Sequence, residues 1–110
     1  MPHYACMVQE GHAAERERHR LSEGLALLAE ETFGDTPAQV EIRWITIRKG
    51  FGFTAGQPST SSLIIRSVPA GFDNTRRTAF MTKVCDLWQS VTGCAADEVV
   101  VTTLEGPLPL

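Results

Sequence analysis

The 110-residue sequence predicts an α/β (more strictly α+β) fold in which a β-α-β unit occurs twice. Two observations lead to this prediction. Patterns typical of strand, helix and strand follow one another twice along the chain, and the landmark residues of the two passes recur at a nearly constant spacing. Gly11 and Gly71 lie 60 positions apart, and Gly34 and Gly93 lie 59 apart. Two such units side by side form a four-stranded sheet with both helices on one face.

Length and composition indicate one domain over residues 1–110, with units at about 1–48 and 62–105 linked by 49–61. The net charge of −3 provides no basic surface for nucleic acid. No apolar run approaches the ~18 residues of a membrane span, and the beginning of the chain lacks the pattern of a signal peptide. The three cysteines have no C-x-x-C spacing and are interpreted as free, buried residues. We therefore expect a cytoplasmic protein without nucleic-acid or membrane partners.

The first unit begins with a strand over 1–8, followed by a turn and a helix from about Ala13 to Phe33. Apolar and small side chains recur in this helix at helical spacing, and Gly34 is expected to end it in the left-handed conformation. Residues 40–47 are rich in β-branched side chains and predict the second strand. The helical stripe consists of Leu21, Leu25, Leu28 and Thr32; one face of the second strand carries Val40, Ile42 and Trp44, and the other carries Glu41, Arg43, Ile45 and Ile47.

The second unit repeats this order. Residues 49–61 are rich in glycine, serine and threonine and predict a loop or hairpin. A strand over 63–68 follows, then a helix that Asp73 or Asn74 caps and Gly93 ends, then a strand over 98–104. The apolar stripe expected for this helix consists of Phe80, Val84, Leu87 and Val91. Both tryptophans, Trp44 and Trp88, are expected to anchor a core or an interface rather than stack on a substrate.

Two helices can cover only one face of the sheet, so the opposite face needs another partner. We expect that bare face to hold apolar residues together with Arg66, Glu41 and Arg43. Sheet faces of this kind are normally buried. Association of identical subunits through the bare face is the simplest solution, and the sequence therefore predicts a homo-oligomer.

Pro2 opens the first strand. If Met1 is removed, as is usual before a small residue, the nitrogen of Pro2 becomes a secondary amine. An α-amino group titrates near pH ~7.7–8.0, and a general base works best near the ambient pH. The first strand would then carry a base into a pocket. Proline is also tolerated at the first position of a strand for purely structural reasons, so this alternative stays open.

A Met-Pro start on a strand, two tandem β-α-β units of about sixty residues and the turn Val8-Gln9-Glu10-Gly11 together resemble the tautomerase superfamily. The resemblance covers nearly the whole chain. It is closest to the two-unit members: cis-3-chloroacrylic acid dehalogenase, malonate semialdehyde decarboxylase and macrophage migration inhibitory factor. It implies a homotrimer, a catalytic Pro2, a pocket at the edge of a subunit interface, and no metal or organic cofactor.

The sequence departs from the family at the positions expected to bind anions. The dehalogenase and decarboxylase branches carry two arginines in the turn after the third strand, where this chain has Pro69-Ala70-Gly71-Phe72-Asp73. His12 stands where 4-oxalocrotonate tautomerase has an arginine after Glu-Gly. Arg66 and Arg43, with Arg76 as a further possibility, are the candidates for binding a substrate carboxylate. Phe72, with Phe51 or Phe53, is expected to provide an apolar wall around Pro2.

The resulting hypothesis is an isomerase of the tautomerase type, in which Pro2 moves a proton on a small 2-oxo or 2-hydroxydienoate acid. Its predicted site residues are Pro2 as the catalytic base, with Arg66, Arg43, Phe72 and His12 binding substrate. Two alternatives stay open. One is dehalogenation, hydration or decarboxylation of a three-carbon acid, which the missing turn arginines disfavour. The other is a trimer that binds small molecules without catalysis. The sequence does not indicate the natural substrate.

Overall fold

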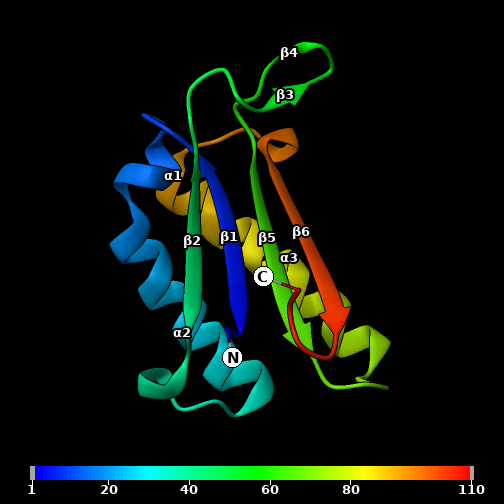
Figure 1. Cartoon of the computed structure of the whole chain (residues 1–110). Helices are drawn as coiled ribbons and strands as arrows, with labels where there is room; N and C mark the ends of the chain where they lie inside the picture. Colours follow the sequence, from blue (N-terminus) through cyan, green and yellow to red (C-terminus); the bar gives the residue numbers. More distant parts are fainter. Residues whose placement is uncertain (1, 110) are drawn as a thin grey trace.

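The structure is a computed structural model that describes residues 2–109. Its main sheet has the strand order β2-β1-β5-β6 (Figure 1). The four strands are β1 (Tyr4–Gln9), β2 (Ile42–Ile47), β5 (Ser62–Val68) and β6 (Val99–Glu105). Pairing is parallel within each unit, β1 with β2 and β5 with β6, and antiparallel where β1 of the first unit meets β5 of the second. The predicted tandem β-α-β architecture is confirmed.

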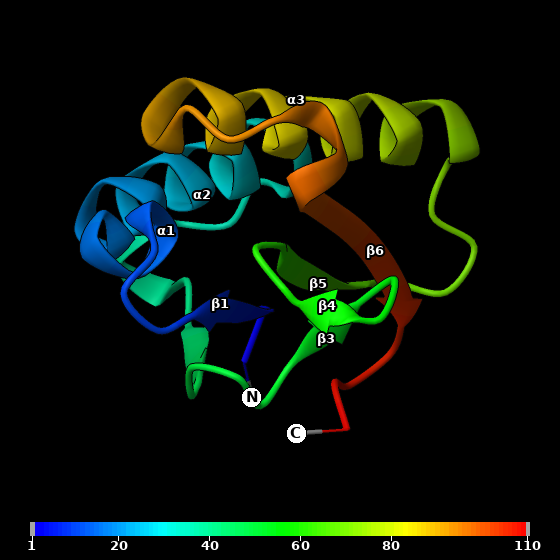
Figure 2. The ribbon, with the colours of Figure 1, turned by 90° about the horizontal axis from the view of Figure 1, so that it is seen from above.

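Helices α1 (Ala13–Arg16), α2 (Arg18–Phe33) and α3 (Asn74–Thr92) all lie on the same side of the sheet (Figure 2). The prediction of one helix over 13–33 was wrong in one respect, because the helix breaks at Glu17, where φ is −99° and ψ is 17°. Short-range hydrogen bonds tie α1 to the turn before it: Arg16 Nη1 donates to Gly11 O, and Gly11 N donates to Glu15 Oε1. No helix within residues 2–109 is long and apolar enough to cross a membrane.

Both long helices end as predicted. Gly34 and Gly93 close α2 and α3 at φ values of 73° and 72°, in the left-handed region that glycine adopts without strain. At the other end of α3, the Asp73 carboxylate accepts a hydrogen bond of 2.9 Å from the backbone N–H of Arg76. Of the two N-cap residues that the sequence allowed, Asp73 and Asn74, the structure has Asp73.

The segment between the units forms a two-stranded hairpin, β3 (Phe53–Thr54) and β4 (Gln57–Pro58). It projects beyond the end of the sheet opposite the N-terminus (Figure 1). Two short 3₁₀ turns, η1 (Pro37–Gln39) and η2 (Ala96–Glu98), precede β2 and β6. The second strand of each unit therefore begins one or two residues later than the sequence predicted.

The core lies between the sheet and the helices. Its fully buried side chains alternate along β1 and recur at helical spacing along α2 and α3. Trp88 lies in this core, and its ring stacks on that of Trp44 with a centroid distance of 6.1 Å. The largest fully buried side chains are Trp88, Tyr4, Phe80, Leu21, Leu25, Ile64, Val8, Val84 and Cys6.

The sheet face away from the helices carries large apolar side chains, including Val100 (52% exposed) and Leu104 (39% exposed). Arg43 is exposed and, from the strand alternation, belongs to this face, as predicted. The placement of Arg66 on the same face was wrong. Arg66 alternates with Leu63 and Ile65 along β5, and its side chain is buried beneath the helices. An arginine can occupy that face because the helix layer supplies it with a partner, as the site geometry below shows.

Two leucines on α2 test this account of the core. Leu25 is completely buried, whereas Leu27 is 61% exposed. We expect Leu25→Ala to lower the free energy of unfolding by about 2–5 kcal/mol, because it removes a core side chain and leaves a cavity. Leu27→Ala should change it by no more than about 0.5 kcal/mol. Urea denaturation of both variants measures this difference, and equal effects would contradict the assigned helix orientation.

Candidate active site

Pro2 is half-buried and lies two residues before the first residue of β1. The next residue fixes its position: His3 N donates to Glu41 O over 2.8 Å, and Ser67 N donates to His3 O over 3.0 Å. The backbone around Pro2 is therefore bonded on both sides. Met1, whose removal would free the Pro2 nitrogen, lies outside the described residues.

Arg66 pairs with Tyr4 across the β1–β5 junction, two residues along the chain from Pro2. Its side chain is only 4% exposed, and its Nη2 donates to Asp35 Oδ2 over 2.7 Å. Its Nε donates to the carbonyl of Ser67 over 2.8 Å. The guanidinium lies over the rings of Tyr4 and Phe33, 4.8 and 4.1 Å from their centroids. Arg66 Nη1 has no hydrogen-bond partner within residues 2–109.

Tyr4 links this arginine to the core. Its hydroxyl donates to Leu25 O over 2.8 Å. Burial raises the pKa of the Tyr4 hydroxyl, and the positive charge of Arg66 only partly opposes that rise. Tyr4 therefore stays neutral and keeps its hydrogen bond to the carbonyl of Leu25 in α2. The anion that balances the charge of Arg66 is Asp35.

A cleft of about 470 Å³ opens beside the buried pair, between the end of α2 and the turn after β5. Arg66, Phe33 and Phe72 line it together with Arg76 from the first turn of α3. The guanidinium of Arg76 lies 5.0 Å from the centroid of the Phe72 ring, and its Nη2 donates to Thr32 O. Two arginines and two aromatic rings thus face one space, which suits a small planar anion.

Acidic residues also line this cleft, but most of their charge is already balanced. Asp35 is bonded to Arg66, and Glu31 forms an ion pair with Lys83 on α3. Glu30 is exposed at the rim. Arg76 is therefore the exposed cation of the cleft, while Arg66 is buried and already paired with Asp35.

The structure brings together only some of the predicted site residues. Arg66 and Phe72 share the cleft, at the end of the sheet where Pro2 lies, although Pro2 itself does not line it. Arg43 is exposed on β2, opposite Ala5 in the register of the sheet. His12 follows the far end of β1, roughly 20 Å from Pro2 at the ~3.3 Å rise of a strand residue.

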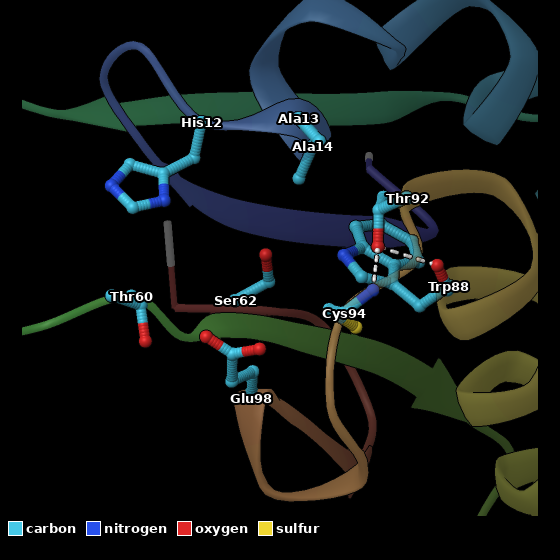
Figure 3. A pocket seen from close by; sticks show the side chains of 9 residues that line it. All are labelled: His12, Ala13, Ala14, Thr60, Ser62, Trp88, Thr92, Cys94 and Glu98. Atoms are coloured by element: carbon cyan, nitrogen blue, oxygen red, sulfur yellow. Dashed lines mark hydrogen bonds between the residues drawn. The ribbon is translucent and has the colours of Figure 1, made fainter.

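His12 lines a second, smaller cavity at that far end, together with Ser62, Trp88 and Glu98 (Figure 3). Phe51 and Phe53 are exposed in the hairpin, also away from Pro2. Within one chain they do not form a wall around Pro2. Within residues 2–109, no group of three or more histidine, cysteine, aspartate or glutamate side chains could hold a metal ion.

The sequence interpretation missed Asp35 and Phe33, the partners of Arg66. A signal was present, because an arginine within an apolar strand requires a buried partner. The position of that partner after Gly34 depends on the packing of the first helix end against the third strand, which no local pattern encodes.

Comparison by sequence finds neither a protein-family model nor a curated protein that matches the chain. Solved structures do match it. The crystal structure of native Ps01740 has a TM-score of 0.86 and 30% identity over 94% of this chain and 93% of its own. Pt0534 inactivated by 2-oxo-3-pentynoate has a TM-score of 0.82 and 23% identity, covering 94% of this chain and 85% of its own.

More distant matches share the fold. N1, a member of the cis-3-chloroacrylic acid dehalogenase family, has a TM-score of 0.85 at 18% identity and covers 96% of this chain and 76% of its own. A fused 4-OT solved as an asymmetric trimer has a TM-score of 0.82 at 20% identity, over 96% of this chain and 87% of its own. Another fused 4-OT was solved as a symmetric trimer.

The Arg66–Asp35 pair predicts a large loss of stability when one partner is removed. We expect Asp35→Ala to lower the free energy of unfolding by about 3 kcal/mol, because it leaves the buried guanidinium without a counter-charge. The double variant Asp35→Ala/Arg66→Met should recover part of that loss. Glu31→Ala, which breaks the exposed pair with Lys83, should cost no more than about 1 kcal/mol. Thermal and urea unfolding compare the three, and equal losses for Asp35→Ala and Glu31→Ala would contradict the assignment.

Proposed function

The chain belongs to the tautomerase superfamily, and we propose that it is an isomerase that uses the Pro2 amine, freed of Met1, as its general base. Its substrate would be a small 2-oxo or 2-hydroxydienoate acid. The observation that carries the proposal is the cleft of arginines and aromatic rings at the same end of the sheet as Pro2.

The register of the sheet supports this assignment. Tyr4 pairs with Arg66, so Pro2 lies two residues beyond that pair, roughly 7 Å further along the strand direction. The turn that follows β5 contributes Pro69 and Phe72 to the cleft. In the dehalogenase and decarboxylase branches this turn carries the anion-binding arginines. Here the cation comes from Arg76, which lies further along the chain in the first turn of α3.

In the proposed reaction, the Pro2 nitrogen takes the proton of the 2-hydroxyl group of a dienol acid. The electrons of the broken O–H bond form the 2-oxo group, and the conjugated C=C electrons shift along the chain to a carbon. That carbon takes the proton back from the protonated proline, and the electrons of the N–H bond return to the nitrogen. Atoms and charge balance without a cofactor. Arg76 would hold the carboxylate, and the buried charge of Arg66 would favour the negative charge that develops on the oxygen. The rings of Phe33 and Phe72 would lie against the planar chain of the substrate.

We also propose that the working unit is a homotrimer. The bare sheet face exposes Val100 and Leu104, which assembly would bury. Phe51 and Phe53 in the hairpin are 72% and 63% exposed and lie far from Pro2 of their own chain. In a trimer they, and Arg43, could reach a neighbouring subunit. The trimeric fused 4-OT structures support this arrangement.

The proposed role of Pro2 can be tested by the mass of the intact chain, by the activity of a Pro2 variant and by covalent labelling of Pro2. Intact-mass analysis should show a chain without Met1. Pro2→Ala should lower kcat/KM for enol-to-keto conversion of phenylpyruvate or 2-hydroxymuconate by about 100-fold, the lower end of the ~10²–10⁴ that general-base catalysis contributes. Pt0534 is inactivated by 2-oxo-3-pentynoate, and we expect this reagent to add to the Pro2 nitrogen of the present chain.

Peptide mapping of the treated protein should then place the added mass on the peptide that begins with Pro2. Undiminished turnover in Pro2→Ala would refute the catalytic role. Retention of Met1 would refute every enzymatic interpretation that depends on the amine, and would leave the non-catalytic binding protein as the surviving alternative.

The role of Arg76 makes a separate prediction. We expect Arg76→Ala to raise KM for these acids by roughly tenfold, the effect of losing one charge-assisted hydrogen bond worth about 1.5 kcal/mol. Arg20→Ala is a matched control, since Arg20 is an exposed arginine on the outer face of α2. Steady-state kinetics on the folded variants measures both, and an unchanged KM in Arg76→Ala would assign the carboxylate to another residue.

A further inference from the structure

The duplication that builds the sheet also gives it a second cavity. The cleft described above lies between the end of α2 and the turn after β5. The second cavity, of about 180 Å³, lies between the end of α3 and the turn after β1. The antiparallel junction of the two units places these two spaces at opposite ends of the sheet. They are counterparts: each is formed by the helix end of one unit and the first turn of the other.

Residue by residue, the second cavity has a different chemistry. At the repeat spacing of 59 or 60, Ser62 occupies the position of Pro2, and His12 occupies that of Phe72. Cys94 likewise occupies the position of Asp35. The second cavity therefore has no proline amine, and no arginine lines it. The second cavity is therefore not suited to the proton transfer proposed for Pro2. Its lining is nevertheless polar and includes Thr60, Ser62 and Glu98.

One buried group in the second cavity lacks a partner. Trp88 is 1% exposed, and its Nε1–H has no hydrogen-bond partner within residues 2–109. Trp88 lines the cavity, and Figure 3 shows its indole nitrogen on the edge of the ring nearest to it. Since the indole N–H is only a donor, it requires an acceptor atom. The other tryptophan is satisfied: Trp44 Nε1 donates to Ser22 Oγ over 3.1 Å.

The opposite side of the cavity is negative. Glu98 points its carboxylate into the space, between Thr60 and Ser62 (Figure 3). Hydrogen bonds from the backbone N–H of Ala95 and from the Thr60 hydroxyl lower the pKa of Glu98, and nearby His12 adds to this effect. Glu98 is therefore ionised at neutral pH and accepts hydrogen bonds without donating any. Such a group attracts a cation and repels the carboxylates that the arginine-lined cleft would bind.

We propose that this second cavity is a binding site for a small amine that also carries a carbonyl or hydroxyl oxygen. The ammonium group would bind to Glu98, and the oxygen would accept from Trp88 Nε1–H and from the hydroxyl of Ser62. The cavity volume of about 180 Å³ is large enough for a molecule of several non-hydrogen atoms. Amino-amides and amino-alcohols have this size. The proposal does not depend on the chemistry of Pro2.

The test uses the two indole N–H signals in a ¹H–¹⁵N NMR spectrum of the full chain, assigned with Trp44→Phe. Glycinamide is the probe, because it carries an ammonium group and a carbonyl two bonds apart. We expect it to shift the Trp88 signal in a saturable manner and to leave the Trp44 signal unchanged. Acetamide, which lacks the amine, and acetate, which is an anion, should each bind at least about tenfold more weakly.

Two variants address the roles of the side chains. Glu98→Gln should remove the preference for glycinamide over acetamide, and Ser62→Ala should weaken glycinamide binding several-fold. Both keep the volume of the cavity close to that of the original chain, and the fold can be checked in the same spectra. A Trp88 signal that does not shift, shifts without saturating, or responds equally to acetate would overturn the proposal.

Discussion

The antiparallel pairing of β1 with β5 is the constraint on which the rest of the structure depends. It joins two parallel β-α-β units into one sheet and places both helices on the same side. It also brings Tyr4 opposite Arg66, so that the beginning of the chain lies beside the end of the third strand. Without this junction, the cleft at the Pro2 end would lack the turn after β5, which supplies Phe72, and the second cavity would lack Ser62.

The same pairing explains why the cleft near Pro2 and the second cavity, which are related by the repeat, can favour ligands of opposite charge. At the Pro2 end, the buried guanidinium of Arg66 is balanced by Asp35, and the exposed guanidinium of Arg76 is left to meet an anion. At the other end, Glu98 is held ionised by its own hydrogen bonds and faces an indole N–H without a partner. The duplicated unit provides the same backbone arrangement at both ends of the sheet. The side chains at each end determine whether the site there binds an anion or a cation.

Much of the fold could be predicted because its signals are local. Gly34 and Gly93 end helices through their own backbone conformation, and Asp73 caps α3 through its own side chain. The alternation correctly grouped Val40, Ile42 and Trp44 on one face, and the structure packs that face against the core. The break at Glu17 was missed; α1, which ends there, is hydrogen-bonded to the turn at Gly11, and the apolar spacing does not reveal this contact.

The site was harder to predict than the fold, because its members come from both units. Arg66 was expected on the bare face, but the third strand presents it to the helices, where Asp35 and two aromatic rings hold it. His12 was grouped with Pro2 on the pattern of a family motif, yet the length of β1 separates them. The spacing of residues along one strand predicts which face each side chain occupies. It does not predict which residue of the other unit, such as Asp35 for Arg66, will contact that side chain.

Catalysis by Pro2 requires that its nitrogen be a free amine that is largely uncharged near neutral pH. An NMR titration of protein labelled with ¹⁵N-proline measures that nitrogen directly. A Pro2 that serves as the general base should give a signal that titrates with a pKa of about 7 or lower, below the ~7.7–8.0 of an ordinary α-amino group. A Pro2 nitrogen that shows no titration, as expected of an amide, or that stays protonated above about pH 9, would contradict that role.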